Sequence, residues 1–175
     1  QVQCQQPIFI IHLTTHDALS FQRQDIQCGA NSRARIVLAS YALDHVVEKR
    51  HVCHHWQLGT DAHVRVESLM ASESAECLSH HYIDQAQGSC FEGLTLQLSG
   101  HRLQELCYSR LSGDHASIDH RMVACPGAAQ HHHHALSTCH AAPQTSTHHE
   151  VKMLVGLQGR GICYSDVTML SGVDG

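Results

Sequence analysis

The segment Arg50-His51-Val52-Cys53-His54-His55-Trp56 has the alternating pattern of a β-strand and carries several metal-binding side chains. Because side chains along a strand point alternately to opposite faces, His51 and Cys53 would share one face. Imidazole and thiolate are good ligands for copper and zinc, so this face offers half of a metal site. The alternative is a strand end with surface histidines, which a chain containing 19 histidines would also produce.

The composition indicates one globular domain over residues 1–175. The chain is 42% hydrophobic and 15% charged, and it is long enough to bury a core. Its 16 acidic residues outnumber its 11 basic ones, so we expect no nucleic-acid partner, which would need a basic surface. No apolar run reaches the length of a membrane-spanning helix, so we expect no membrane partner.

The cysteine content and the first residue predict a secreted, extracellular protein. Nine cysteines favour an oxidising compartment, although metal binding would also use thiols. The sequence begins with Gln instead of Met, which suggests a removed signal peptide. Because nine is odd, at least one cysteine is free, metal-bound or paired with another chain. Spacing alone assigns no partner to Cys4, Cys28, Cys90, Cys107 or Cys139.

Short β-type segments separated by turn sequences predict an all-β fold. Two longer polar stretches, 61–88 and 126–150, are predicted to be loops, and the second has low complexity. About eight strands with two long loops indicate a sandwich or barrel, and no internal repeat is identified. The predicted strands are 2–13, 18–24, 34–43, 51–58, 94–98, 103–111, 118–125, 151–157 and 161–170.

Three further segments follow residues 50–56 along the chain, and each resembles a part of the same known family. Cys77-Leu78-Ser79-His80-His81-Tyr82 resembles the cysteine, metal-bridging histidine and aromatic residue of copper/zinc superoxide dismutases. The segment 111–124, which begins Leu-Ser-Gly-Asp-His, resembles the stretch before the last copper ligand of that family. Gly159-Arg160-Gly161-Ile162-Cys163 resembles its active-site arginine and disulfide cysteine. The histidine content is similar to that of the extracellular, self-associating dismutase-like proteins of bivalve haemolymph, the pernin and cavortin type.

This resemblance implies an eight-stranded Greek-key β-barrel or sandwich with two long loops. It also implies a disulfide between Cys77 and Cys163, and an anion-guiding role for Arg160 if the chain is an active dismutase. The implied copper ligands are His51 with Cys53, or His54 if the strand carries an insertion, then the bridging His81 or His80, and finally Cys125.

The departures from the family imply a degenerate metal site. After Asp84, the short loop before residue 94 supplies no histidine or aspartate for a zinc site. Thiolates at two copper positions would favour Cu(I) or Zn(II) in a closed site with no room for superoxide. Cys53 and Cys125 could instead form a structural disulfide between neighbouring strands.

The second predicted loop adds the tract His131-His132-His133-His134. Adjacent imidazoles on a flexible segment can gather divalent ions with low positional precision. The alternative is a solvated loop without a ligand.

These observations favour an extracellular, histidine-rich metal carrier or storage protein that binds zinc or copper on a dismutase-like fold. The alternative is an active copper/zinc superoxide dismutase with unusual ligands. A third hypothesis is a structural protein whose histidines set a pH- or metal-dependent interface. In each case the partners expected are metal ions and further copies of the chain, in a homo-oligomer or larger self-assembly.

Overall fold

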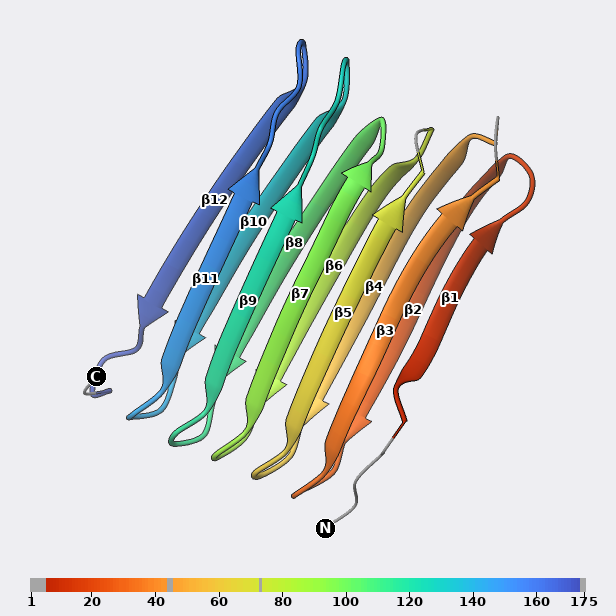
Figure 1. Cartoon of the computed structure of the whole chain (residues 1–175). Coiled ribbons are helices and arrows are strands. Elements are labelled where there is room, and N and C mark those ends of the chain that lie inside the picture. The colour runs from red at the N-terminus through yellow and green to blue at the C-terminus, as the bar shows by residue number, and fades with distance from the viewer. Residues whose placement is uncertain (1–5, 44–45, 73, 174–175) are drawn as a thin grey trace.

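A computed structural model describes residues 6–43, 46–72 and 74–173. These residues form twelve β-strands joined by short turns (Figure 1). The strands are β1 (Ile8–Thr14), β2 (Ala18–Cys28), β3 (Arg33–Ala42), β4 (Glu48–Leu58), β5 (His63–Ala71), β6 (Glu76–Gln85), β7 (Cys90–Ser99), β8 (Arg102–Leu111), β9 (Ser117–Ala124), β10 (His131–His140), β11 (Ser146–Met153) and β12 (Arg160–Met169).

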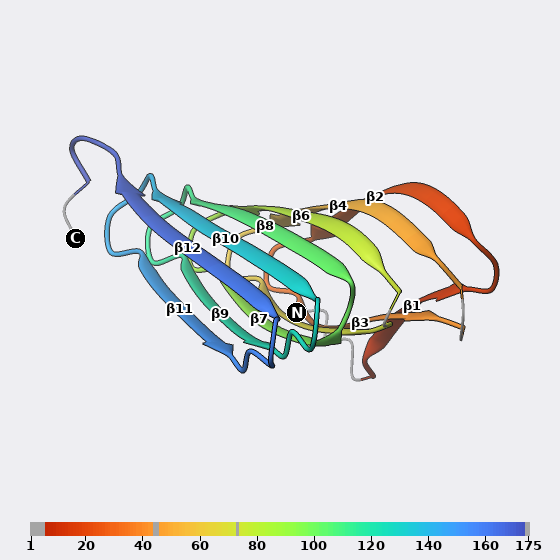
Figure 2. The ribbon, with the colours of Figure 1, turned by 90° about the horizontal axis from the view of Figure 1, so that it is seen from above.

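The strands form two parallel sheets of six strands each, in the orders β1-β3-β5-β7-β9-β11 and β2-β4-β6-β8-β10-β12. Figure 2 shows the two sheets lying face to face along the molecule. The chain alternates between the sheets and advances by one strand in each, which makes a β-solenoid of about five coils. The all-β prediction is therefore confirmed, but the Greek-key barrel or sandwich is wrong, because strands in that fold pair antiparallel.

Tight turns close each coil at the lower end of Figure 1. In the first of them the Ser32 amide donates to the Gly29 carbonyl at 3.2 Å, and in the next Ala62 donates to Gly59 at 3.1 Å. A Cβ atom at Gly113 would collide with the Gln87 backbone of the preceding coil. Each turn has one residue with a positive φ, at intervals of 27 to 30 residues: Asn31, Asp61, Gly88, His115 and Gln144. The chain therefore contains an internal repeat that the sequence reading missed.

Both predicted long loops are in fact strands. Residues 61–88 contain β5 and β6, and residues 126–150 contain β10 and most of β11. Histidine, serine and threonine are frequent in the second stretch, and both stretches form strands because every second side chain faces the solenoid interior. In β10 the buried residues alternate with more exposed ones from His131 to His140.

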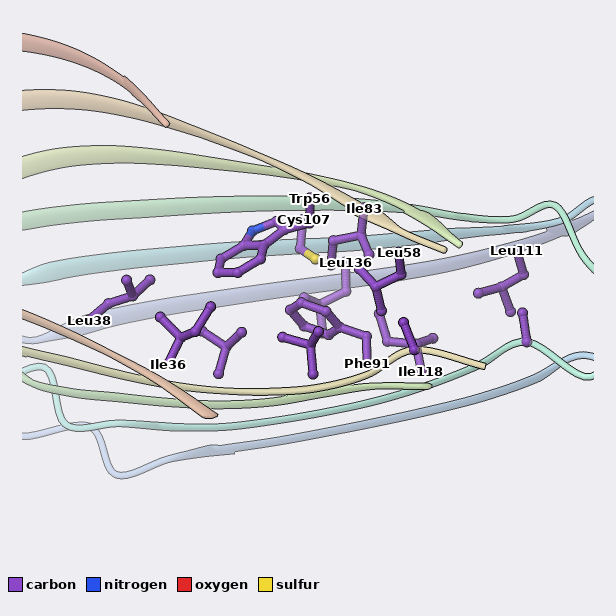
Figure 3. Close-up of a cluster of buried hydrophobic side chains, with 14 residues drawn as sticks. Ile36, Leu38, Trp56, Leu58, Ile83, Phe91, Cys107, Leu111, Ile118 and Leu136 are labelled. Carbon is purple, nitrogen blue, oxygen red and sulfur yellow. The ribbon is translucent and has the colours of Figure 1, made fainter. Parts of the chain in front are cut away.

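The half of the interior next to the tight turns is apolar. Trp56 lies between the sheets with its ring edge-on to Phe91, at a centroid distance of 5.6 Å. Around it pack Ile83, Leu58 and Leu136, all almost fully buried (Figure 3). Burial of such side chains contributes roughly 1.5–3 kcal/mol each, so this apolar half is the main hydrophobic core.

Candidate functional site

The other half of the interior, next to the connections at the upper end of Figure 1, is polar. In this half of the solenoid, inward-facing positions of neighbouring strands carry ionisable side chains. Register partners in a parallel sheet lie side by side on the same face, so these side chains are stacked along the interior. The ionisable side chains of this polar half are Glu48, Arg50, His54, His81, Glu105, His120, His132 and His134, and the buried Ser40, Ser79, Thr95 and Gln97 lie among them.

Glu105 in β8 is the central acid of the polar half and is 4% exposed. Its carboxylate accepts hydrogen bonds from Thr95 Oγ1 at 3.3 Å and from Gln97 Nε2 at 3.0 Å. The Nε2 atom of His120 lies 3.8 Å from Glu105 Oε1. Burial raises the pKa of Glu105 to about 7, so this group can take or release a proton near neutrality.

His134 lies beside Glu105 in the register of β10 and β8, and its side chain is fully buried. Neither of its ring nitrogens has a hydrogen-bond partner among the described residues. Burial lowers the pKa of His134 to about 3 and that of His120 to about 4. Both imidazoles are therefore neutral and keep lone pairs available for a ligand.

A second histidine pair lies on β4 and β6. The rings of His54 and His81 stack at a centroid distance of 4.7 Å, and His81 Nε2 lies 3.1 Å from Ser79 Oγ. Burial, with the Arg50 charge, lowers the pKa of His54 to about 4. A cavity of about 50 Å³ lies among these residues and Arg50, which is room for a small ligand or water.

Arg50 and Glu48 connect this pair to the first coil. Arg50 Nη1 lies 3.5 Å from Glu48 Oε1, and Arg50 Nη2 lies 3.6 Å from Cys77 Sγ. Glu48 accepts a hydrogen bond from Thr14 Oγ1 at 2.9 Å and contacts His12 at 3.1 Å. The positive and negative charges buried here are therefore paired, in contrast to the unpartnered histidine of β10.

The predicted metal ligands lie on both faces of the second sheet and, in one case, after a strand of the first sheet. His51, Cys53 and His80 point outward, with the rings of His51 and His80 5.0 Å apart, whereas His54 and His81 point inward. Cys125 follows β9 in the opposite sheet. Among the described residues these side chains form no group of three with donor atoms within 4.8 Å of one another. The implied four-ligand copper set is not brought together.

The histidine tract divides in the same way. His132 and His134 point into the polar half, while His131 and His133 lie on the outer face of β10. His131 stands between Arg102 and Arg160 in the register and lines, with them, a hollow of about 510 Å³. Arg160 is thus an exposed residue of an edge strand. Metal binding by the tract stays a prediction.

The predicted disulfide between Cys77 and Cys163 is wrong. Cys77 lies in β6 and Cys163 in β12, with β8 and β10 between them. Strands in a sheet are about 4.8 Å apart, so three spacings exceed the roughly 7 Å that a disulfide can bridge. All eight cysteines in the described part of the chain are free thiols, and Cys4 lies outside it. The same finding excludes the bond between Cys53 and Cys125.

Sequence reasoning missed Glu105 and His120, although a signal for both was present. Leu103, Glu105 and Cys107 alternate along one predicted strand, and His120 stands between Ile118 and Met122 on another. An apolar residue on each side at period two places the polar residue on the buried face. Burial raises the pKa of Cys107, so this thiol stays protonated and is a poor nucleophile.

Comparison with known proteins identifies a family for this chain. The family model described as "SUF system FeS cluster assembly, SufBD core domain" matches residues 10–172. A search of curated proteins finds no match to the chain. In the described residues, no helix is long and apolar enough to cross a membrane.

The family match corrects the functional expectations drawn from the dismutase resemblance. It replaces that resemblance itself, together with the metal-carrier function, the active-dismutase alternative and the copper or zinc cofactor, since it points to iron and sulfur. The predicted extracellular location is also wrong, because SUF assembly is a cytoplasmic pathway. Membership implies interaction with other proteins of the SUF system. The match extends over almost the whole solenoid, and the chain belongs to the SufBD core-domain family of SUF iron–sulfur cluster assembly.

Proposed function

We propose that this chain is a scaffold subunit for iron–sulfur cluster assembly, and that the polar half of its interior binds the iron or sulfur cargo. The proposal takes residues 1–175 as a single domain. The observation that carries it is the family match over residues 10–172. The iron and sulfide are substrates that pass through the complex, and they are not a resident cofactor of the chain.

The chemistry of the polar half supports this role. Buried polar groups in proteins are nearly always hydrogen-bonded, so the two unpartnered ring nitrogens of His134 are consistent with a position that binds a ligand. Neutral imidazole binds iron, and thiolate or sulfide completes such coordination. Glu105, with a pKa of about 7, can accept the proton that a sulfur species releases when it binds metal.

The edge strand β12 supports association with another subunit. Its partner β10 lies on one side only, so its other side carries unpaired backbone groups. Ile162 and Tyr164 on this strand are 59% and 57% exposed. An exposed parallel edge is a template for a strand of another chain. We propose that a second solenoid subunit, either another SUF protein or a further copy of this chain, extends the sheet here.

The test uses Glu105→Gln and His134→Leu in the complex that the chain forms with its SUF partners. Cluster formation is followed anaerobically by the visible sulfur-to-iron absorption, with iron and a sulfur donor supplied. Both variants keep the size of the side chain but remove the proton acceptor or the free nitrogens, so we expect several-fold less cluster per complex.

The matched control is His148→Gln, because His148 lies on the outer surface and is 58% exposed. Its cluster yield should equal that of the unchanged chain. Circular dichroism and gel filtration verify that all three variants fold and assemble. Full cluster yield in both interior variants would contradict the role of the polar half, and failure of the unchanged complex to build clusters would contradict the scaffold function.

A further inference from the structure

His63, Cys90 and Glu92 form a cluster on the outer face of the first sheet, away from the polar half. One donor atom from each lies within 4.8 Å of the other two. His63 Nε2 and Glu92 Oε1 are 3.1 Å apart. All three side chains are half-buried, so their donor atoms are held by the sheet and remain accessible to an ion.

The parallel register builds this cluster. His63 begins β5 and Cys90 begins β7, and the two residues are direct register partners in the sheet. Glu92 follows Cys90 by two residues, so both side chains project from the same face. Because all three positions lie in paired strands, the backbone positions the ligands before any ion binds.

The charge of Glu92 is left available to an ion. Two arginines lie near it, but Arg65 Nε contacts Glu67 at 3.0 Å and Arg121 Nη2 contacts Asp119 at 2.6 Å. The ion pair of Glu92 is with His63, a group that binds metal when neutral. The cluster thus combines one nitrogen, one sulfur and one oxygen ligand, and in the described part of the chain no arginine forms an ion pair with its carboxylate, although the charge of Arg121 acts on Glu92 from nearby.

A hollow of about 210 Å³ adjoins the cluster on the side of Glu92. It is lined by Glu92, Gly93 and Leu94, together with the paired Arg65, Asp119 and Arg121. A metal held by three protein ligands keeps an open coordination position, and such positions are typical of sites that exchange a ligand. This hollow provides the space for the exchanging ligand.

We infer that His63, Cys90 and Glu92 are a three-ligand site for a divalent transition-metal ion, with the open position facing this hollow. Mixed nitrogen, sulfur and oxygen ligands suit ferrous iron, which is the ion that cluster assembly consumes. The choice of iron rests on the proposed function, whereas the existence of the site rests on the geometry alone. Binding requires the thiolate, so each ion bound displaces the Cys90 proton.

The experiment titrates the purified full chain anaerobically with Fe(II), and in parallel with Co(II) as a spectroscopic probe. We expect one ion per chain at this site and a thiolate-to-cobalt charge-transfer band. Cys90→Ser should abolish the band and weaken the binding of both metals at least tenfold. His63→Gln and Glu92→Gln should keep the band but weaken binding, because the thiolate remains.

The matched control is Cys53→Ser, since Cys53 is also half-buried on an outer sheet face and lies near His51 and His80. This variant should keep the band and the affinity. A band that survives in Cys90→Ser, or is lost in Cys53→Ser, would overturn the assignment, as would the absence of a band in the unchanged chain.

The two proposals fail separately in this design. Metal binding is read without any cluster assembly, and cluster yield is read with iron in excess. A chain that binds Co(II) through Cys90 but whose complex builds no clusters keeps this site and loses the proposed function. A complex that builds clusters while the chain shows no Cys90-dependent binding keeps the proposed function and loses this site.

Discussion

The two halves of the solenoid interior are enclosed by the same sheets in the same register, yet they have opposite chemistry. The half near the tight turns contains Trp56, Ile83 and Phe91, whereas the other half contains Glu105, His120 and His134. Burial of polar groups without partners destabilises the fold, and burial of large apolar side chains offsets this cost. The apolar half therefore stabilises the coils and allows the polar half to hold reactive groups.

Acidification should show the largest difference between the halves. The pKa values of His54, His120 and His134 in the fold are about 4, 4 and 3, below the ordinary value of 6.5. A lowered pKa means that the neutral form stabilises the fold above pH 6.5, and this stability is lost as the pH falls toward 4. By about pH 4, each of these histidines has lowered the free energy of unfolding by about 3 kcal/mol relative to neutral pH.

Glu105 opposes this trend, because its raised pKa makes the fold bind its proton more strongly below about pH 7. One carboxyl group against three histidines leaves a net loss. Urea unfolding at about pH 7 and about pH 4.5 should therefore show several kcal/mol less stability at the lower pH. The His134→Leu variant should show a smaller loss. Equal stability at both pH values would contradict the burial of these histidines.

The next largest effect should come from the apolar half. Replacing Trp56 with alanine removes its contact with Phe91 and leaves a cavity, which should cost about 3–5 kcal/mol. Trp56 is the single tryptophan of the sequence, so unfolding is followed by circular dichroism instead of fluorescence. Trp56→Phe, which keeps an aromatic ring, is the control and should lose less. A cost below about 1 kcal/mol would place the stabilising core elsewhere.

A smaller effect on stability is expected from Glu105, the acid of the polar half. Because the fold raises the pKa of Glu105, the stability linked to its neutral form is lost as the pH rises from about 4.5 through 7. Glu105→Gln should therefore be more stable than the unchanged chain by roughly 1–3 kcal/mol at about pH 8, and equally stable at about pH 4. Thermal unfolding at both pH values measures this, and a gain at low pH alone would contradict it.

Several strands could be predicted from the sequence because their side chains alternate. The pattern in 103–111 and 118–125 shows which residues share a face, and β8 and β9 lie there. Alternation does not show which strand is the neighbour or whether it runs parallel. A parallel solenoid and an antiparallel barrel produce the same local pattern, so a resemblance between short segments does not distinguish the two topologies.

The candidate site could be predicted only in part. His54, His81, His132 and His134 were selected as metal ligands for their chemistry, but the sequence could not separate inward from outward histidines. The biased, low-complexity composition of 126–150 predicts a loop, whereas the tract 131–134 begins β10. The repeated turns at 27 to 30 residues were the signal that would have corrected both errors, since they fix the length of a coil.

The start of β10 has an unusual consequence for the pairing of that strand. A shift of one residue normally exchanges the buried and exposed side chains of a strand, which is a strong barrier to misalignment. Across His131–His134 the same shift would replace histidine by histidine on both faces, so this end of β10 does not resist slippage. The alignment of β10 with β8 and β12 must therefore be determined by the second half of the strand, where Leu136 and Thr138 are buried between the more exposed Ala135, Ser137 and Cys139.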